Sequence, residues 1–285
     1  MKKTAILTDS TCCLPPELVK EYGIRLVPLP IIYREKTYFD GVDITPGEIY
    51  RIMRKRQDLP TTSTPSAGSF LEAYREASAE AEGIVCIVLT SLQSKIFEIA
   101  CLGRELARET IPDTRIEVID SRAVAGALGF VVLEAARAAA RGCDASEVVR
   151  IAQETIPRVG LVAMLDTLWY LARTGRIARA AAWAGNLLNV KPVVEHTTSV
   201  GETTPAARPR TQRKAVETML KLIEDRANGR PIRVMVHHAD ELEEARKLKE
   251  EMSSRFSCEE LYFSEFTPGM GVHCGPGVLA ISTYI

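Results

Sequence analysis

Short apolar runs alternate with longer amphipathic segments through the first half of the chain. Runs rich in β-branched residues at 4–8, 83–90 and 115–119 read as strands, and 25–33 reads as an extended edge segment with two prolines. Between and after these strands the spacing of apolar residues predicts helices at 16–22, 45–57, 64–82, 94–110, 126–141 and 145–156. This alternation predicts βαβ units around a parallel sheet.

The pattern changes in the second half. Strands are expected at 158–165, 191–195, 232–237, 261–266 and 278–284, helices at 166–173, 177–188, 212–227 and 240–255, and a hairpin or loop at 197–209. We therefore predict an α/β protein of two domains, 1–155 and 156–285. Two domains suit this length, because a single core stops growing near 250 to 300 residues, roughly.

Composition and charge exclude several classes of protein. The 285 residues carry 36 Lys and Arg against 37 Asp and Glu, a net charge of −1, which is unlike the basic surplus of a nucleic-acid binder. No apolar run is long enough for a stable membrane insertion, and the N-terminus lacks the pattern of a signal peptide, so we expect a cytoplasmic protein. Seven cysteines without a CxxC spacing argue against a disulfide framework and a zinc ribbon.

Hydroxyl side chains follow the predicted strands of the first half. They occur at 8–11, 90–94 and 120–121, and a further group at 61–66 precedes a helix. Ligands of open α/β sheets bind outside the carboxyl ends of the strands, and helix N-termini add positive potential there. Without the Gly-rich pattern and Lys of a phosphate-binding loop, these groups suit a small, singly charged anion such as a carboxylate. The alternative is that each hydroxyl only caps a helix.

Eight short motifs, in order along the whole chain, resemble one known family. They are Asp9-Ser10-Thr11 with Leu14-Pro15, the stretch 60–66, Thr90-Ser91-Leu92-Gln93-Ser94, Ile119-Asp120-Ser121, Leu171 to Ile177, Lys191-Pro192-Val193, Arg210 to Ala215, and Gly271 to Gly277. Together these are similar to the DegV family of bacterial fatty-acid-binding proteins, some of which are the acyl-carrying subunit of a fatty acid kinase.

The resemblance implies two α/β domains, the first with a mainly parallel sheet and the second with a mixed sheet flanked by helices. A long-chain fatty acid such as palmitate would lie in a tunnel between them, with its carboxylate on Thr62 and Ser94. His273 and Arg176 would lie near this headgroup, and Ser63 and Ser121 are secondary candidates. It implies a lipid-binding protein without a cofactor rather than an enzyme, at most the accessory subunit of a kinase.

The chain departs from the family pattern at a few positions. Thr64 replaces a glutamine, Leu92 and Lys95 replace small residues, and Cys13 stands where an acidic residue is usual. Lys95 could strengthen anion binding or point to solvent, and we favour solvent because lysine is seldom buried. The roles of Cys13 and Cys274 stay open.

The acyl tail should dominate the affinity. About 14 methylenes at roughly 0.8 kcal/mol each are worth about 11 kcal/mol before the costs of binding, so a deep apolar tunnel is required. Candidate lining residues share apolar character and helical placement; they are Ala181, Ala184, Leu187, Leu188, Ile96, Phe97, Ala127 and Phe130.

Two other classes of function fit some of the same residues. A serine esterase could use Ser10 or Ser94 with His273 and either Asp9 or Asp120, although the GxSxG elbow is missing. A metal site could use His237, His238, His273 and Cys274, but neighbouring residues on a strand point to opposite faces.

A basic cluster, Arg208, Arg210, Arg213 and Lys214, suggests a partner surface. It could dock an acidic patch on a fatty acid kinase. The alternative is a solvated loop and helix face.

Overall fold

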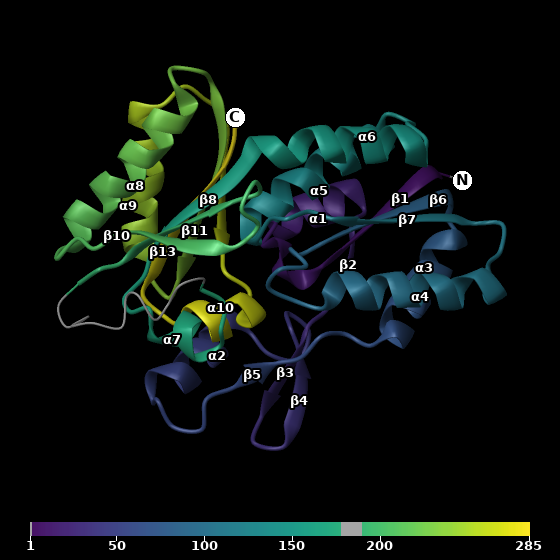
Figure 1. Ribbon diagram of the computed structural model, residues 1–285, viewed down its shortest axis with the longest axis horizontal. Helices are drawn as coiled ribbons and strands as arrows, with labels where there is room; N and C mark the ends of the chain where they lie inside the picture. Colours follow the sequence, from purple (N-terminus) through teal and green to yellow (C-terminus); the bar gives the residue numbers. More distant parts are fainter. Residues whose placement is uncertain (1, 178–189) are drawn as a thin grey trace.

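The computed structural model describes residues 2–177 and 190–285, which are built around two β-sheets lying side by side (Figure 1). The first sheet is parallel throughout, in the order β2-β1-β6-β7. Its strands are β1 (Lys2–Asp9), β2 (Arg25–Val27), β6 (Ala81–Val88) and β7 (Arg115–Asp120). Residues of β6 alternate between two cores, Val85 and Ile87 on one face and Ile84 and Cys86 on the other. A continuous apolar run is what such double burial requires.

Helices cover both faces of this parallel sheet. On one face lie α3 (Ala67–Ser78) and α4 (Ile96–Thr110), and on the other α1 (Pro16–Tyr22), α5 (Ala125–Ala140) and α6 (Ala145–Thr155) (Figure 1). The short 3₁₀ turn η1 (Ser10–Cys12) follows β1, and η2 (Ile156–Arg158) leads out of α6 into the second sheet.

The second sheet is mixed, in the order β10-β9-β8-β13-β11-β12, with only β11 and β12 parallel. Its strands are β8 (Val159–Met164), β9 (Val193–Thr197), β10 (Thr203–Ala207), β11 (Ile232–Ala239), β12 (Cys258–Glu265) and β13 (Val278–Tyr284). One face is covered by α8 (Gln212–Ala227) and α9 (Leu242–Arg255). The other face packs on α5, which therefore contacts both sheets.

Smaller elements lie below the junction of the two sheets in the view of Figure 1. A three-stranded antiparallel sheet has the order β4-β3-β5, with β3 (Pro30–Tyr33), β4 (Lys36–Phe39) and β5 (Thr61–Thr62). The helices α2 (Pro46–Arg54), α7 (Trp169–Arg173) and α10 (Pro268–Cys274) lie next to it (Figure 1). None of the helices within the described ranges combines the length and apolar character needed to cross a bilayer.

The predicted fold class is confirmed, with corrections at individual elements. The helix expected at 64–82 begins after Ser66, whose side chain accepts a hydrogen bond from the Ser69 amide, and it ends at Ser78. Gly83 lies inside β6 rather than stopping a helix. The helix α10 was not predicted, because its glycines are typical of a turn. The helix expected at 177–188 lies outside the described residues, except for Ile177 at its edge.

The domain boundary near 155 stays a prediction. It coincides with the passage from α6 through η2 into the second sheet. One buried apolar cluster nevertheless includes Ile6 of β1, Phe130 of α5 and Ala280 of β13, so the core is continuous across that point.

Candidate functional site

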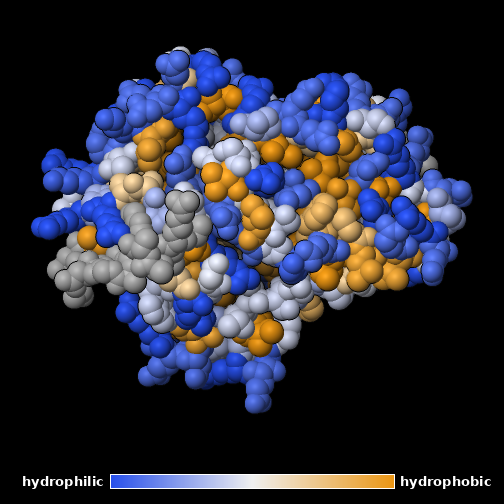
Figure 2. Space-filling view, viewed as in Figure 1, coloured by the Kyte–Doolittle hydropathy of each residue, from blue (hydrophilic) through white to orange (hydrophobic). Residues whose placement is uncertain are grey.

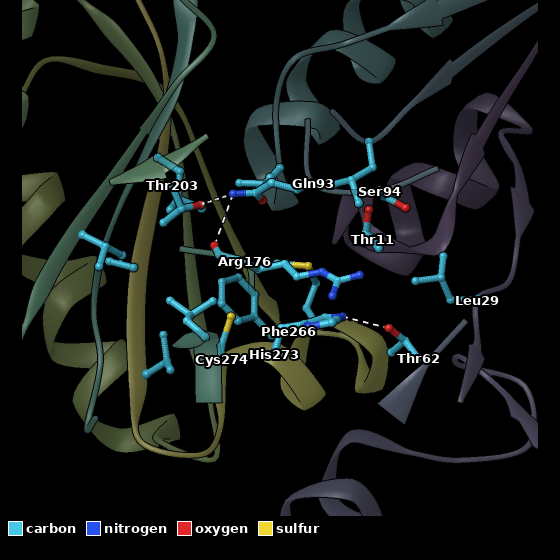
Figure 3. Close-up of a pocket in the computed structure, with 18 of the residues that line it drawn as sticks. Thr11, Leu29, Thr62, Gln93, Ser94, Arg176, Thr203, Phe266, His273 and Cys274 are labelled. Carbon is cyan, nitrogen blue, oxygen red and sulfur yellow. Dashed lines mark hydrogen bonds between the residues drawn. The ribbon is translucent and has the colours of Figure 1, made fainter. Parts of the chain in front are cut away.

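A pocket lies between the two sheets and takes residues from both halves of the chain (Figure 3). It holds about 860 Å³ of space, counting the part open to solvent. The space-filling view shows a hollow where the halves meet, bordered by apolar as well as polar residues (Figure 2). The first half contributes Thr11, Leu29, Thr62, Ser63, Thr64, Leu89, Gln93, Ser94 and Val124. The second contributes Leu161, Ala163, Leu165, Leu171, Arg176, Val194, Thr203, Phe266, Met270, His273, Cys274 and Val278.

Thr62 and His273 meet at one corner of this pocket. The Thr62 Oγ1 atom lies 2.9 Å from His273 Nε2, a hydrogen bond between residues 211 positions apart (Figure 3). Pairing of β5 with Ile31 of β3 places Thr62, and α10 places His273. The start of α10 is held in turn by Asp40, whose Oδ1 accepts a hydrogen bond of 2.9 Å from the Gly269 amide.

Burial keeps the imidazole of His273 neutral. It lowers the pKa of His273 to about 4, and the nearby guanidinium groups of Arg176 and Arg173 add to the effect. The Nδ1 atom is buried and has no hydrogen-bond partner within the described part of the chain. Figure 3 shows the Arg176 side chain reaching into the space near Thr62, Ser94 and His273. The positive charge of this corner therefore comes from arginine rather than histidine.

Ser94 lies on the loop that leads into α4. Its Oγ accepts a hydrogen bond of 3.3 Å from the Ile96 amide while the residue lines the pocket. The N-cap residue of α4 is Lys95, so Ser94 is not the helix cap, although its hydroxyl contacts an amide of the first turn and also lines the pocket. Because the oxygen accepts from the amide, the hydroxyl proton is available to a further acceptor.

The secondary candidates differ in position. Ser63 lines the pocket and is exposed, and Thr64 lines it as well. Ser121 is fully buried outside the pocket lining, and its Oγ accepts from the Ala123 amide at 3.1 Å. The structure thus brings Thr62, Ser63, Ser94, Arg176 and His273 to one pocket and leaves Ser121 in a turn.

In the described part of the chain, no hydrogen bond joins the groups named for a serine esterase, although Ser94 and His273 line the same pocket. Ser10 Oγ donates to Asp40 Oδ2 at 2.6 Å, and Asp9 accepts from the Leu89 amide at 2.8 Å. Asp120 accepts from the Ser91 amide at 3.1 Å and from the Ser91 hydroxyl at 2.5 Å. The hydrogen-bond partner of His273 is Thr62, so no serine in the described residues is paired with this base.

The histidines named for a metal site also point apart. His237 Nε2 lies 3.1 Å from Ser282 Oγ, and its ring packs on Phe266 with centroids 5.2 Å apart. His238 faces Glu265 instead. Within residues 2–177 and 190–285, no group of three or more histidine, cysteine and acidic side chains is arranged to hold a metal ion.

The residues that depart from the family pattern lie in different environments, some exposed and some buried. Lys95 is exposed and pairs with Glu98 at 2.8 Å, so the prediction that it points to solvent is confirmed. Leu92 is exposed. Cys13 is buried with a φ of 50°, and burial raises its thiol pKa well above the usual value. Cys274 lines the pocket, and burial raises its pKa to about 12, which keeps it an unreactive thiol.

The apolar wall of the pocket comes mainly from the second sheet. Leu161, Ala163 and Leu165 project from β8 and its end at every second position, as expected for one face of a strand. The lining candidates named from the sequence lie elsewhere: Ile96, Ala127 and Phe130 are wholly buried in the cores, and Phe97 packs against the α3–α4 core. Ala181, Ala184, Leu187 and Leu188 lie outside the described residues.

Two polar residues of the pocket were not predicted from the sequence. Gln93 Nε2 donates to Thr203 Oγ1 at 3.1 Å and to the Arg176 carbonyl at 3.3 Å (Figure 3). Gln93 lies within a motif that pointed to Ser94, but Thr203 is 110 residues away in a hairpin. No local pattern announces such a contact, because it depends on how the two sheets pack.

The chain matches one protein family over almost its whole length. A family described as "Uncharacterised protein, DegV family" matches residues 3–285. A DegV domain-containing protein of Caldanaerobacter subterraneus subsp. tengcongensis is 34% identical over 99% of this chain and 98% of the relative. Protein DegV of Bacillus subtilis is 33% identical over 97% of each chain.

Solved structures agree with these relatives. A DegV family protein from Thermus thermophilus, described by its fatty acid binding, has a TM-score of 0.91 at 31% identity and covers 100% of this chain and 99% of its own. DegV of Bacillus subtilis, described as a fatty acid binding protein, has a TM-score of 0.87 at 30% identity, with 100% of both chains covered.

Proposed function

The chain belongs to the DegV family, and we propose that it binds a long-chain fatty acid in the pocket between its two sheets. The observation that carries the proposal is the division of that pocket. A polar corner with Thr62, His273 and Arg176 adjoins an apolar wall that includes Leu161 and Ala163. An amphiphile with one charged end matches this division, and the description of two similar structures as fatty acid binding supports it.

In this proposal the carboxylate of the fatty acid accepts hydrogen bonds from Thr62 and Ser94. Neutral His273 can donate its Nε2 proton to Thr62 Oγ1, which leaves the threonine proton free for the ligand. Ser94 offers its proton while its oxygen accepts from the Ile96 amide. Arg176 compensates the ligand charge, so the site does not bury an unpaired anion.

The acyl tail then lies against the second sheet. The methylenes contribute most of the free energy of binding, at roughly 0.8 kcal/mol for each one removed from water. Leu161, Ala163 and Val194 give a smooth wall without a charged group. The headgroup contacts mainly fix the orientation of the lipid, with its carboxylate at the polar corner.

Lipid extraction followed by mass spectrometry of the purified protein tests the proposal. We expect a fatty acid to co-purify, and palmitate or oleate to bind the delipidated protein. The Thr62→Ala/Ser94→Ala variant should lose headgroup orientation more than tail affinity, because the apolar wall is unchanged. Absence of any co-purified acid, together with no binding of added palmitate or oleate, would refute it.

The proposed role of the bound lipid is presentation to a fatty acid kinase, which would form an acyl phosphate. The basic cluster supports a docking surface for an acidic partner, since Arg208, Arg210, Arg213 and Lys214 are all exposed. Reversal of Arg210 and Arg213 to Glu should slow acyl phosphate formation and leave fatty acid binding intact. Equal loss of both activities would argue against docking at this surface.

A further inference from the structure

The loop that carries Ser94 is fastened on two sides. Thr90 Oγ1 donates a hydrogen bond of 2.8 Å to the Gly201 carbonyl, in the turn between β9 and β10. Ser91 Oγ donates to Asp120 Oδ2 at 2.5 Å, which ties the loop to the end of β7. The next residue but one, directly before Ser94, is a glutamine that joins the loop to two further groups of the second half (Figure 3).

The amide nitrogen of this glutamine, Gln93, makes both contacts. Gln93 Nε2 lies 3.3 Å from the Arg176 carbonyl oxygen and 3.1 Å from Thr203 Oγ1. A side-chain amide nitrogen carries two hydrogens, so it can donate to both oxygens at once. Because a carbonyl oxygen only accepts, the nitrogen and not the oxygen of the Gln93 amide faces Arg176. The contact to Arg176 therefore needs a donor at position 93.

A chain of hydrogen bonds sets the direction of the Thr203 hydroxyl. His196 Nε2 lies 3.0 Å from the Arg122 carbonyl oxygen, so this nitrogen carries the ring proton. Burial lowers the pKa of His196 to about 4, which leaves Nδ1 without a proton at neutral pH. Nδ1 therefore accepts from Thr203 Oγ1, 3.2 Å away, and the Thr203 oxygen accepts from Gln93. Both contacts of Gln93 thus agree on one orientation of its amide.

Arg176 is held at both ends of its backbone. Its amide donates to the Leu171 carbonyl at 2.9 Å, while its carbonyl accepts from Gln93. Its guanidinium donates to the Thr174 carbonyl, and the side chain reaches into the pocket near Ser94 (Figure 3). Gln93 thus connects the loop of Ser94 with the residue that brings positive charge to the polar corner.

We infer that Gln93 is a positioning residue of the headgroup site, which holds Arg176 beside Ser94 and thereby makes the pocket select a carboxylate over a neutral headgroup. The inference rests on the proposed function, because it takes the fatty acid carboxylate to lie at this corner. A carboxylate gains a charge-assisted hydrogen bond from a guanidinium, whereas an alcohol with the same tail gains mainly the burial of its methylenes. Displacement of Arg176 should therefore weaken binding of the acid and spare the alcohol.

Titration calorimetry of the delipidated protein with palmitate and with hexadecanol tests the inference, because the two ligands have equal tails and differ in headgroup charge. The unchanged protein should prefer palmitate. Gln93→Leu removes the donors and keeps most of the bulk, so it should lower the ratio of the two affinities roughly tenfold and leave hexadecanol affinity unchanged. Gln153→Leu, at an exposed glutamine of α6, is the matched control and should keep the ratio.

A double-mutant cycle separates positioning from a direct role of Gln93. Arg176→Leu should lower the ratio as well, and the Gln93→Leu/Arg176→Leu variant should be no less selective than Arg176→Leu alone, because Gln93 acts through Arg176. Thr203→Val removes one of the two acceptors of Gln93 Nε2 and is the second variant if Gln93→Leu does not fold. It should lower the ratio by a smaller factor.

Three results would overturn the inference alone. They are an equal loss of palmitate and hexadecanol affinity in Gln93→Leu, which indicates a structural role, a ratio that Gln93→Leu leaves unchanged, and additive effects in the cycle. An unchanged protein that binds neither ligand would instead refute the proposed function, and the inference with it.

Discussion

All four histidines of the chain have a lowered pKa, with burial as the main cause in each. His237 is the extreme case. Burial lowers its pKa to about 3, from 6.5 for a histidine in an unfolded chain. Its ring is enclosed by Ser282, Phe266 and Gly126. A buried neutral imidazole can accept a proton only after unfolding, so acid should destabilise the fold through these residues.

Acid should destabilise the fold through His237. Between about pH 6.5 and 3 the unfolded chain binds a proton at position 237 that the folded chain does not, so the free energy of unfolding should fall as pH falls, by roughly 1.4 kcal/mol per pH unit. Asp9 and Asp40, whose pKa values burial raises, act in the opposite direction. We therefore compare the protein with His237→Gln by urea unfolding at pH 7 and 5. The variant should lose about 2 kcal/mol less over this interval; identical losses would contradict the assignment.

Gly126 illustrates packing at the scale of one methyl group. A Cβ there would lie 2.3 Å from His237 Nε2 and 2.9 Å from Ser282 Oγ, so α5 approaches the second sheet more closely than alanine permits. Gly126→Ala should destabilise the protein by about 1–3 kcal/mol, measured by urea unfolding. Gly47→Ala is the control, because nothing lies within 4 Å of its added Cβ. A Gly126→Ala variant as stable as Gly47→Ala would show that the helix moves away freely.

At the scale of elements, the short helix α10 carries His273, so the stability of this helix determines where His273 lies in the pocket. Its N-cap is Thr267, which accepts from the Met270 amide, and Asp40 holds the next turn through Gly269. Neither Thr267 nor Asp40 lines the pocket. Fatty acid affinity should therefore depend on residues that do not touch the lipid.

Thr267→Ala tests this dependence. Loss of an N-cap costs about 1 kcal/mol, and here the disturbed helix positions His273, so palmitate affinity should fall as well. Thr211→Ala is the matched control, since Thr211 caps α8 by accepting from the Lys214 amide. Both variants should lose similar stability in urea unfolding, and only Thr267→Ala should bind palmitate more weakly in a fluorescence titration. Equal affinity of the two variants would separate α10 from the site.

The helix α10 also shows which features could not be predicted from the sequence. Strands with continuous apolar runs, such as β6, and helices with capping boxes, such as α2, follow from local pattern and were predicted within a few residues. The start of α10 depends on Asp40, which is 229 residues from Gly269, so its glycines looked like a turn. The family motifs pointed to Thr62, Ser94 and His273, which line one pocket, whereas the Gln93–Thr203 contact could not be predicted because it depends on how the two sheets pack.

For the molecule as a whole, the sequence suggests two domains, but the contacts join them. α5 belongs to the first half and packs on β1, β8 and β13. Phe130 of α5 lies against Tyr262 and Tyr284, with ring centroids 6.4 and 6.2 Å apart. Arg137 of α5 pairs with Glu260 of β12 at 2.7 Å, and Arg233 of β11 with Glu134 at 2.9 Å. One face of α5 is therefore completed only by the second half.

A fragment of residues 1–155 should consequently fail to reach the native fold. Without the second sheet, α5 would expose Phe130 and neighbouring apolar residues, at a cost of roughly 25 cal/mol per Å² of apolar surface, and Glu134 and Arg137 would lose their partners. We expect the fragment to aggregate or to lack dispersed NMR signals, and the full chain to unfold in a single transition seen alike by circular dichroism and tryptophan fluorescence. A fragment with native-like signals, or two separate transitions of the full chain, would show instead that position 155 divides two units that fold independently.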